Sequence, residues 1–218
     1  MFRSNKLVVI LPLILTVFMF ASGIYYLNQT ESITNEELSE SISWLPHLTK
    51  EGEQTLLEAE WLWEASPDDG ITGTDYIGVT FLDGNGDALA GSEINETAVT
   101  LRHSEETIFE GEGEKKEDGV LFVFPNQADD HETYGNDGRV EVVLNSSEAE
   151  EAVITYLHTW KEHEEINTED LRFFDPGFEE SDHMDDYYWV TEQLVQTGEP
   201  RNERPLFQKG VMFLGSIT

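Results

Sequence analysis

The chain contains no cysteine among its 218 residues. It therefore has no disulfide framework, no thiol nucleophile, no thiolate metal site and no residue that could carry the lipid of a lipoprotein. Small exported domains often depend on disulfides, so this chain must instead be stabilised by a hydrophobic core. Its length suffices for one sizeable domain or two small ones.

Basic residues are scarce, with 12 Lys and Arg against 45 Asp and Glu, and the net charge is −33. No acidic residue precedes Glu31, so leaving out Arg3 and Lys6 takes the charge of residues 31–218 from −33 to −35. Such a charge repels nucleic acid and anionic lipid, which excludes a nucleic-acid-binding role, and it attracts cations or basic proteins. The aromatic content of 11% argues against a disordered acidic tail.

One long apolar run, residues 7–27, follows the two basic residues. As a helix it would be roughly 32 Å long, enough to cross a hydrocarbon core of about 30 Å. The positive-inside rule predicts a cytoplasmic tip at residues 1–6, a transmembrane signal-anchor at 7–27 and a single-pass protein of the cell membrane. A cleaved signal peptide with small residues near Ala21 is the alternative. Both place the remaining chain outside the cytoplasm.

Residues 28–52 are predicted to form an acidic stalk. Thr34 and Glu37 have the spacing of a capping box, which predicts a short helix over residues 35–44. Residues 53–218 are then expected to form a single extracytoplasmic domain, since no Pro- or Ser-rich linker divides them. Its first part, 53–145, is β-rich, and its second part, 146–218, is α/β.

The β-rich part has apolar residues at every second position, as in Trp61 and Trp63, and turns rich in Gly, Asp and Asn. Short strands at this spacing predict an antiparallel β-sandwich. The turn from Asp83 to Gly91 resembles those of bacterial immunoglobulin-like surface domains. That resemblance is confined to these residues and implies an immunoglobulin-like sheet region.

In the second part the apolar period changes to that of a helix. Ser147 and Glu150 form a second capping box, and the apolar spacing after them predicts a helix over residues 148–164. Residues 187–195 fit either a helix or a strand, and we favour a strand paired with another at 211–217. The expected fold is therefore α+β: a sandwich-like sheet region, a C-terminal helix and strands, all preceded by one N-terminal transmembrane helix.

Two loops offer oxygen ligands for calcium. Asp83, Asn85 and Asp87 have the alternate spacing of a calcium loop. However, Ala88 stands where an EF-hand needs glycine, and Ile94 where it needs glutamate. An ordinary hairpin turn is therefore the alternative interpretation.

The second loop brings together Asp129, Asp130 and Asp137, and its alternative is a solvated surface loop. His158 and Glu162, at i and i+4, could share a metal if residues 148–164 were helical.

No catalytic motif stands out: the chain has no G-x-S-x-G elbow, no P-loop and no dinucleotide-binding glycine pattern. No cofactor is predicted apart from possible calcium. We therefore expect a membrane-anchored, acidic binding or interaction domain of the bacterial cell envelope, with a cation or an envelope protein as partner. The alternatives are an envelope hydrolase that uses carboxylates and a calcium-stabilised surface module.

Overall fold

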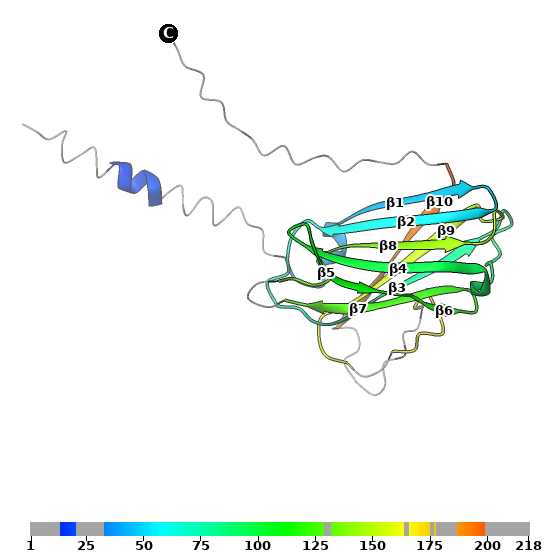
Figure 1. The fold of residues 1–218 in the computed structure, drawn as a ribbon. Coiled ribbons are helices and arrows are strands. Elements are labelled where there is room, and N and C mark those ends of the chain that lie inside the picture. Colours follow the sequence, from blue (N-terminus) through cyan, green and yellow to red (C-terminus); the bar gives the residue numbers. More distant parts are fainter. Residues whose placement is uncertain are drawn as a thin grey trace, which may run out of the picture.

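Ten antiparallel strands in two sheets make up the fold of this computed structural model (Figure 1). The structure describes residues 14–20, 33–128, 132–163, 166–174, 177 and 187–198. The strands are β1 (Ile42–Glu51), β2 (Gln54–Trp63), β3 (Thr72–Leu82), β4 (Ile94–His103), β5 (Glu106–Gly111), β6 (Glu114–Lys116), β7 (Gly119–Gln127), β8 (Asp137–Leu144), β9 (Glu151–Thr159) and β10 (Tyr188–Gln196). Two short 3-10 helices, η1 (Leu38–Ser41) and η2 (Gly91–Glu93), precede β1 and β4.

The two sheets lie face to face as the layers of a sandwich. The first sheet has the order β1-β2-β8-β4-β5 and the second the order β10-β9-β3-β7-β6, with antiparallel pairing throughout. A bridge between Leu48 of β1 and Thr197, just after β10, joins the sheets along one side.

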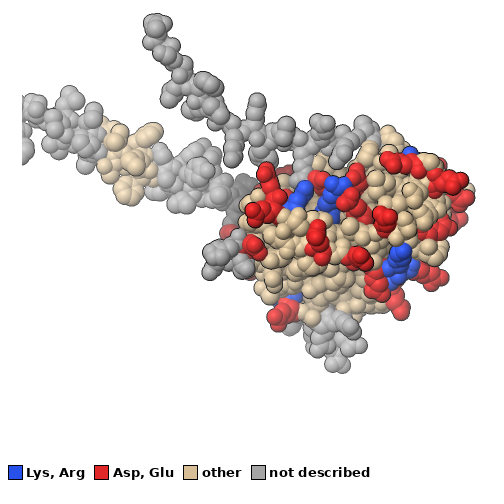
Figure 2. All heavy atoms as spheres, viewed as in Figure 1, with Lys and Arg blue, Asp and Glu red and all other residues tan. Residues whose placement is uncertain are grey.

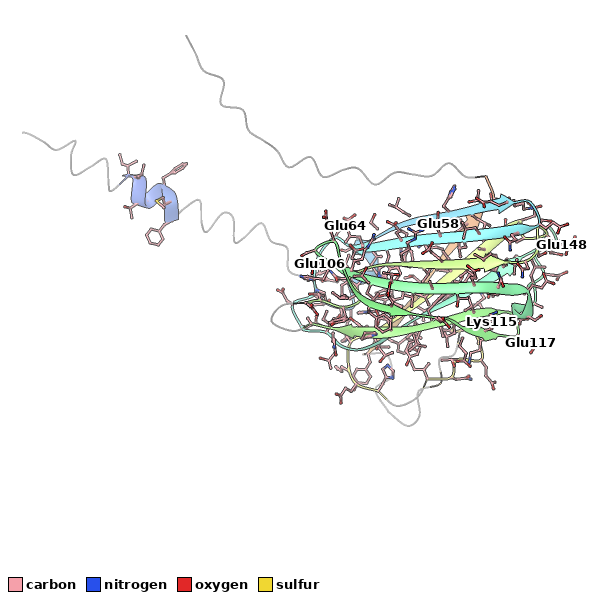
Figure 3. The ribbon with its side chains drawn as sticks, viewed as in Figure 1. Glu58, Glu64, Glu106, Lys115, Glu117 and Glu148 are labelled. Atoms are coloured by element: carbon pink, nitrogen blue, oxygen red, sulfur yellow. The ribbon has the colours of Figure 1, made fainter. Side chains whose placement is uncertain are left out.

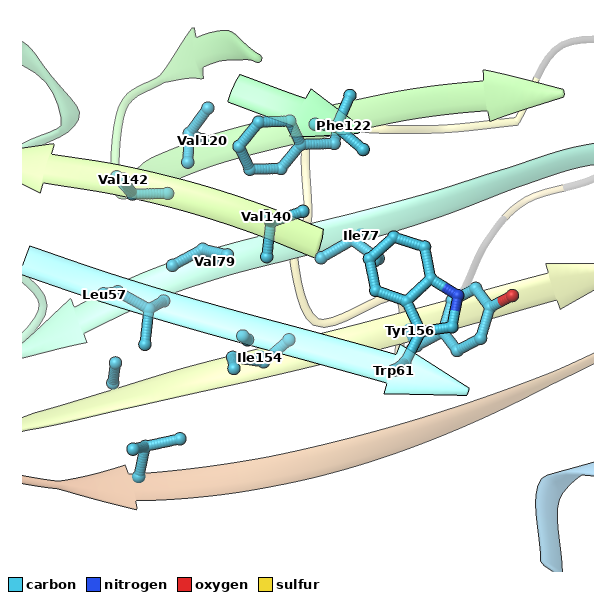
Figure 4. Close-up of a cluster of buried hydrophobic side chains, with 14 of the residues drawn as sticks. Leu57, Trp61, Ile77, Val79, Val120, Phe122, Val140, Val142, Ile154 and Tyr156 are labelled. Carbon is cyan, nitrogen blue, oxygen red and sulfur yellow. The ribbon is translucent and has the colours of Figure 1, made fainter. Parts of the chain in front are cut away.

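The inward-facing side chains of both sheets form one hydrophobic core (Figure 4). Trp61 of β2 is fully buried there and stacks on Phe124 of β7, with 5.4 Å between ring centroids. Gly138 of β8 makes room for this ring, since a Cβ at that position would lie 2.3 Å from Trp61 Cζ2. The alternation predicted for the β-rich part of the sequence therefore corresponds to this core.

A second, smaller cluster lies on the outer face of the second sheet. Residues 166–174, here called the cover segment, place Ile166, Leu171 and Phe173 on Tyr76 and two other outward side chains of the sheet. The segment approaches β3 so closely that a Cβ on Gly78 would lie 2.1 Å from the carbonyl oxygen of Leu171. The second sheet is therefore covered on both faces in this region.

The expected helix over residues 148–164 is wrong, because residues 151–159 form strand β9, which lies between β10 and β3 in the second sheet. Ile154 and Tyr156 face the main core, whereas Leu157 faces the cover segment. Burial on both faces removes the apolar–polar alternation of a half-exposed strand and leaves spacings that fit a helix as well. The β-branched residues Val153 to Thr155 were the strand signal. The fold is accordingly an antiparallel β-sandwich rather than α+β.

The expected stalk and its helix over residues 35–44 are also incorrect. Only the short helix η1 forms there, and residues 42–51 are strand β1 at the edge of the first sheet. The capping-box contact is nevertheless present, since the backbone N–H of Thr34 donates to Glu37 Oε2 at 3.0 Å. Pro46 lies within β1, which an edge strand tolerates because one side of it needs no partner.

The N-terminal transmembrane helix of the expected fold is not supported. Within residues 7–27 the structure describes only residues 14–20, which are helical. In the described part of the chain, no helix combines the length and the apolar character that a membrane crossing requires.

The segment 187–195, which fitted either a helix or a strand in the sequence analysis, contributes strand β10. Its expected partner at 211–217 lies outside the described residues, and within them β10 pairs with β9.

Candidate functional site

A fully buried polar network lies at one end of the sandwich. It consists of Asn35 before η1, Asp75 on β3, Asn126 on β7, and Tyr156 and His158 on β9, each 0% exposed. The strand residues occupy inward positions on the same faces as the core residues, so the sheet pleat itself brings them together.

Asp75 is the centre of this network. Its Oδ1 accepts from Asn126 Nδ2 at 2.9 Å and from the backbone N–H of Thr159 at 3.0 Å. Its Oδ2 accepts from the Tyr156 hydroxyl and lies 3.1 Å from His158 Nδ1. Burial, and next the charge of Asp75, raise the pKa of Tyr156 well above its ordinary value. Tyr156 is therefore a neutral donor at any physiological pH.

Asn35 closes the network from outside the sheets. Its Nδ2 donates to Asp69 Oδ1 at 2.8 Å and to the Gly70 carbonyl oxygen at 2.7 Å, and its Oδ1 lies 3.1 Å from His158 Nε2. Its own carbonyl oxygen accepts from Trp189 Nε1 at 2.8 Å. Residues before η1 are thereby fastened to the β2–β3 loop, to β9 and to β10.

Aromatic rings enclose His158. Its ring centroid lies 4.8 Å from that of Trp189, 5.2 Å from that of Trp63 and 5.7 Å from that of Trp160. A histidine–aspartate pair resembles the base of many catalytic sites. Because none of the five side chains is exposed, this pair reaches no dissolved reactant in the conformation described, and its role here is structural.

Sequence reasoning missed Asp75. It stands two residues before Ile77, on the same inward face as Ile77, Val79 and Phe81. A lone carboxylate in the register of a core face was the available signal, since a buried charge needs partners. Those partners could not be read from the sequence, because they lie on β7, on β9 and before η1.

Outside the core, two hollows open next to the loop that follows β3. The first, here called the acidic hollow, has a volume of about 580 Å³, and its lining residues include Asp118, Glu169 and Asp170 as well as Arg172. The second, of about 560 Å³, is lined by Asp83, Glu150 and Glu151, and Gly86 lines both. Six acidic residues therefore contribute to the lining of two adjoining depressions.

The first predicted calcium loop is a turn whose carboxylate already accepts several hydrogen bonds. Asp83 Oδ1 accepts from the backbone N–H of Asn85 at 2.8 Å and of Asp87 at 2.9 Å. These N–H groups, that of Asp87 first, lower the pKa of Asp83. Within the described ranges no group of three His, Cys, Asp or Glu is placed to hold a metal ion. Calcium binding stays a prediction from the sequence.

The other candidate ligands are dispersed. Asp129 and Asp130 lie outside the described residues, and Asp137 accepts from Arg102 Nη2 at 2.8 Å on the outer face of the first sheet. His158 points into the core, whereas Glu162 follows the end of β9 and is exposed. The proposed sharing of one metal by His158 and Glu162 depended on a helix that does not form.

Comparison with known proteins gives distant likenesses only. No protein-family model matches this chain, and no curated protein matches it. AvmM, which catalyses macrocyclization in alchivemycin A biosynthesis, is similar in structure at 13% sequence identity, with a TM-score of 0.35, over 74% of this chain and 90% of that chain. The Fcho1 Mu homology domain of Danio rerio with bound Eps15 peptide is similar at 9% identity, with a TM-score of 0.31, over 56% of this chain and 40% of that chain.

Proposed function

We propose that this chain is an acidic binding domain whose partner is a basic protein segment, rich in Lys or Arg. The observation that carries the proposal is the pair of adjoining hollows with six acidic residues in their lining. An extended basic segment could place its side chains in both hollows. A binding role also agrees with the charge of −35 over residues 31–218, which attracts cationic partners over a wide range of approach.

Two acidic residues that line the second hollow are held in the ionised form by hydrogen bonds. Asp83 and Glu150 have pKa values below their ordinary values, Asp83 through backbone N–H donors and Glu150 through the hydrogen bond from Lys50. Asp118 and Glu169 are exposed and available to a partner. Arg172, which also lines the acidic hollow, is already engaged by Glu192 through Nε at 2.7 Å.

Acidic side chains are spread over the visible face of the sandwich, with few Lys and Arg among them (Figure 2). An experiment therefore has to distinguish nonspecific electrostatic attraction of a basic peptide to the whole surface from its binding at the hollows. The chain offers a matched control, because Glu64 and Glu106 lie at the opposite end of the sandwich from Glu117, the neighbour of Asp118 (Figure 3).

The test is fluorescence anisotropy with a labelled hexalysine peptide. We expect binding that weakens with salt, and the double variant Asp118→Asn/Glu169→Gln to bind about threefold to tenfold more weakly, as two exposed ion pairs predict. The control Glu64→Gln/Glu106→Gln removes the same charge and should bind almost normally. Equal weakening in both variants, or no binding by the unmodified chain, would contradict the proposal. A hexaglutamate peptide serves as the negative probe.

A further inference from the structure

We propose that Glu150, in the lining of the second hollow, is a subsite for one lysine ammonium of the basic partner, and that Lys50 occupies this subsite until the partner binds. This inference rests on the proposed binding function and names the side chain that the subsite selects. Its basis is an ammonium that the chain itself places on Glu150, since Lys50 Nζ lies 2.8 Å from Glu150 Oε1.

Lys50 reaches Glu150 from the other sheet. It lies on edge strand β1, opposite buried Thr55 and two residues after buried Leu48, so its side chain leaves the strand on the inward face. Glu150 directly precedes β9 of the second sheet. The two sheets meet at this side of the sandwich, where Leu48 forms a bridge with Thr197. The sheets themselves therefore bring this ammonium to the second hollow.

Glu150 has a fixed backbone and a side chain that a partner can reach. Its backbone N–H donates to the Leu82 carbonyl oxygen at 2.9 Å, and its own carbonyl oxygen accepts from the backbone N–H of Thr197 at 3.0 Å. The side chain is nevertheless 52% exposed. Because exposed ion pairs contribute little to stability, a second ammonium can replace Lys50 without disturbing the fold.

The carboxylate of Glu150 favours lysine over arginine. Its Oε2 accepts from Thr197 Oγ1 at 3.2 Å, which leaves Oε1 for a cation. A guanidinium binds a carboxylate best through two parallel hydrogen bonds, whereas an ammonium is a compact charge that can use one oxygen. The chain shows both modes: Arg172 donates to both oxygens of Glu192, at 2.7 and 2.8 Å, and Lys50 contacts one oxygen of Glu150.

The other two acidic residues of the second hollow accept from neutral donors. Asp83 accepts from backbone N–H groups of its own turn, and Glu151 Oε1 accepts from Gln196 Nε2 at 2.7 Å. Neither contact supplies a positive charge. Glu150 is therefore the position in this hollow at which a cation of the chain and a cation of the partner compete for the same oxygen.

The first measurement is the affinity of labelled hexalysine for Lys50→Met, a variant that keeps an unbranched apolar side chain and lacks the ammonium. We expect binding about threefold tighter than in the unmodified chain, as the loss of one competing exposed ion pair predicts. The control is Arg139→Met, which removes the same charge from an ion pair with Glu58 and Glu141 on the first sheet. An equal gain in both variants would show that only net charge matters and would overturn the proposal.

Two comparisons assign the gain to Glu150 and to lysine. In the background Glu150→Gln, the change Lys50→Met should no longer tighten the binding of hexalysine, because the carboxylate for which the two ammonium groups compete is absent. With hexaarginine as the probe, Lys50→Met should give a smaller gain than with hexalysine. A gain that persists without Glu150, or an equal gain with both peptides, would overturn the proposal.

The second measurement uses the unmodified chain with ¹³C-labelled lysine, observed by nuclear magnetic resonance while unlabelled hexalysine is added. We expect the ε-methylene signal of Lys50 to move toward that of a solvated lysine, and the signal of Lys115, whose Nζ donates to the Ile94 carbonyl oxygen at 2.6 Å, to stay constant. A peptide that binds and is weakened by Asp118→Asn/Glu169→Gln, but leaves Lys50 unchanged, would overturn this inference and leave the proposed function standing. Absence of any binding would overturn both.

Discussion

Asp83 is the residue at which backbone hydrogen bonds and charge are most directly linked. Its carboxylate accepts N–H groups of Asn85 and Asp87 within a turn that projects from the end of β3. Donors of this kind stabilise the ionised form, which is why the pKa of Asp83 is lowered. Because the pKa of Asp83 is lower in the folded chain than in the unfolded chain, its ionised carboxylate stabilises the fold at pH values above the ordinary aspartate pKa. This stabilisation is lost as the pH falls through the lowered pKa of the folded state.

The variant Asp83→Asn tests this linkage, since asparagine keeps an accepting oxygen but carries no charge. We expect it to melt below the unmodified chain at pH 7, and the difference to shrink as pH falls from the ordinary aspartate value of 3.8 toward the lower pKa of the folded state. Thermal melts at pH 7 and pH 3 measure it. A difference of the same size at both pH values would show that shape, rather than charge, sets the role of Asp83.

At the scale of elements, residues 33–41, here called the N-terminal turn, belong to the folded domain. Leu38 of η1 is fully buried in the main core, and Ile33 forms a bridge with Pro67. The turn covers one end of the space between the sheets, next to the polar network. A segment that reads as polar spacer in the sequence therefore contributes both packing and hydrogen bonds.

The variant Leu38→Ala measures that contribution. Removal of a fully buried leucine side chain should lower the free energy of unfolding by about 2–5 kcal/mol. Leu194 of β10, which is 57% exposed, is the matched control, and Leu194→Ala should change it by less than about 0.5 kcal/mol. Urea denaturation of both variants gives the two values. If both variants lost a similarly small amount of unfolding free energy, residues 33–41 would contribute little to stability and would act as a spacer.

At the scale of the whole molecule, self-repulsion sets the response to salt. A chain with a charge of −33 gains from screening, which acts over about 8 Å at physiological ionic strength. The ion pairs on the sheet faces offset only part of this charge: Arg102 and Arg139 each contact two carboxylates on the first sheet.

Melting the protein in calcium, magnesium and sodium chloride at matched ionic strength tests screening against metal binding. We expect the melting temperature to rise by a similar amount in all three salts, because Asp83 already accepts several hydrogen bonds. A rise specific to calcium would contradict this and would support the metal site predicted from the two acidic loops. A bound ligand at about 100 times its dissociation constant adds roughly 2.7 kcal/mol, which such a melt detects.

Local patterns identified several strands correctly and failed where both faces of the chain are buried. Alternation through Trp61 and Trp63 marked β2. Strand β9 was misassigned because the cover segment buries its outer face. The acidic composition predicted an anionic surface. It did not predict that two hollows would lie beside the loop that follows β3.

The sequence alone determined the strongly anionic charge, the absence of thiol chemistry and the alternating apolar positions of a sheet protein, because composition and local periodicity do not depend on distant contacts. Only the tertiary structure decided that residues 151–159 are a strand, that residues 33–41 complete the core and that His158 meets Asp75 and Asn35. These partners are 83 and 123 positions away from His158 along the chain. A buried polar group is satisfied by whichever residues the sheets bring to it, and no local pattern specifies them.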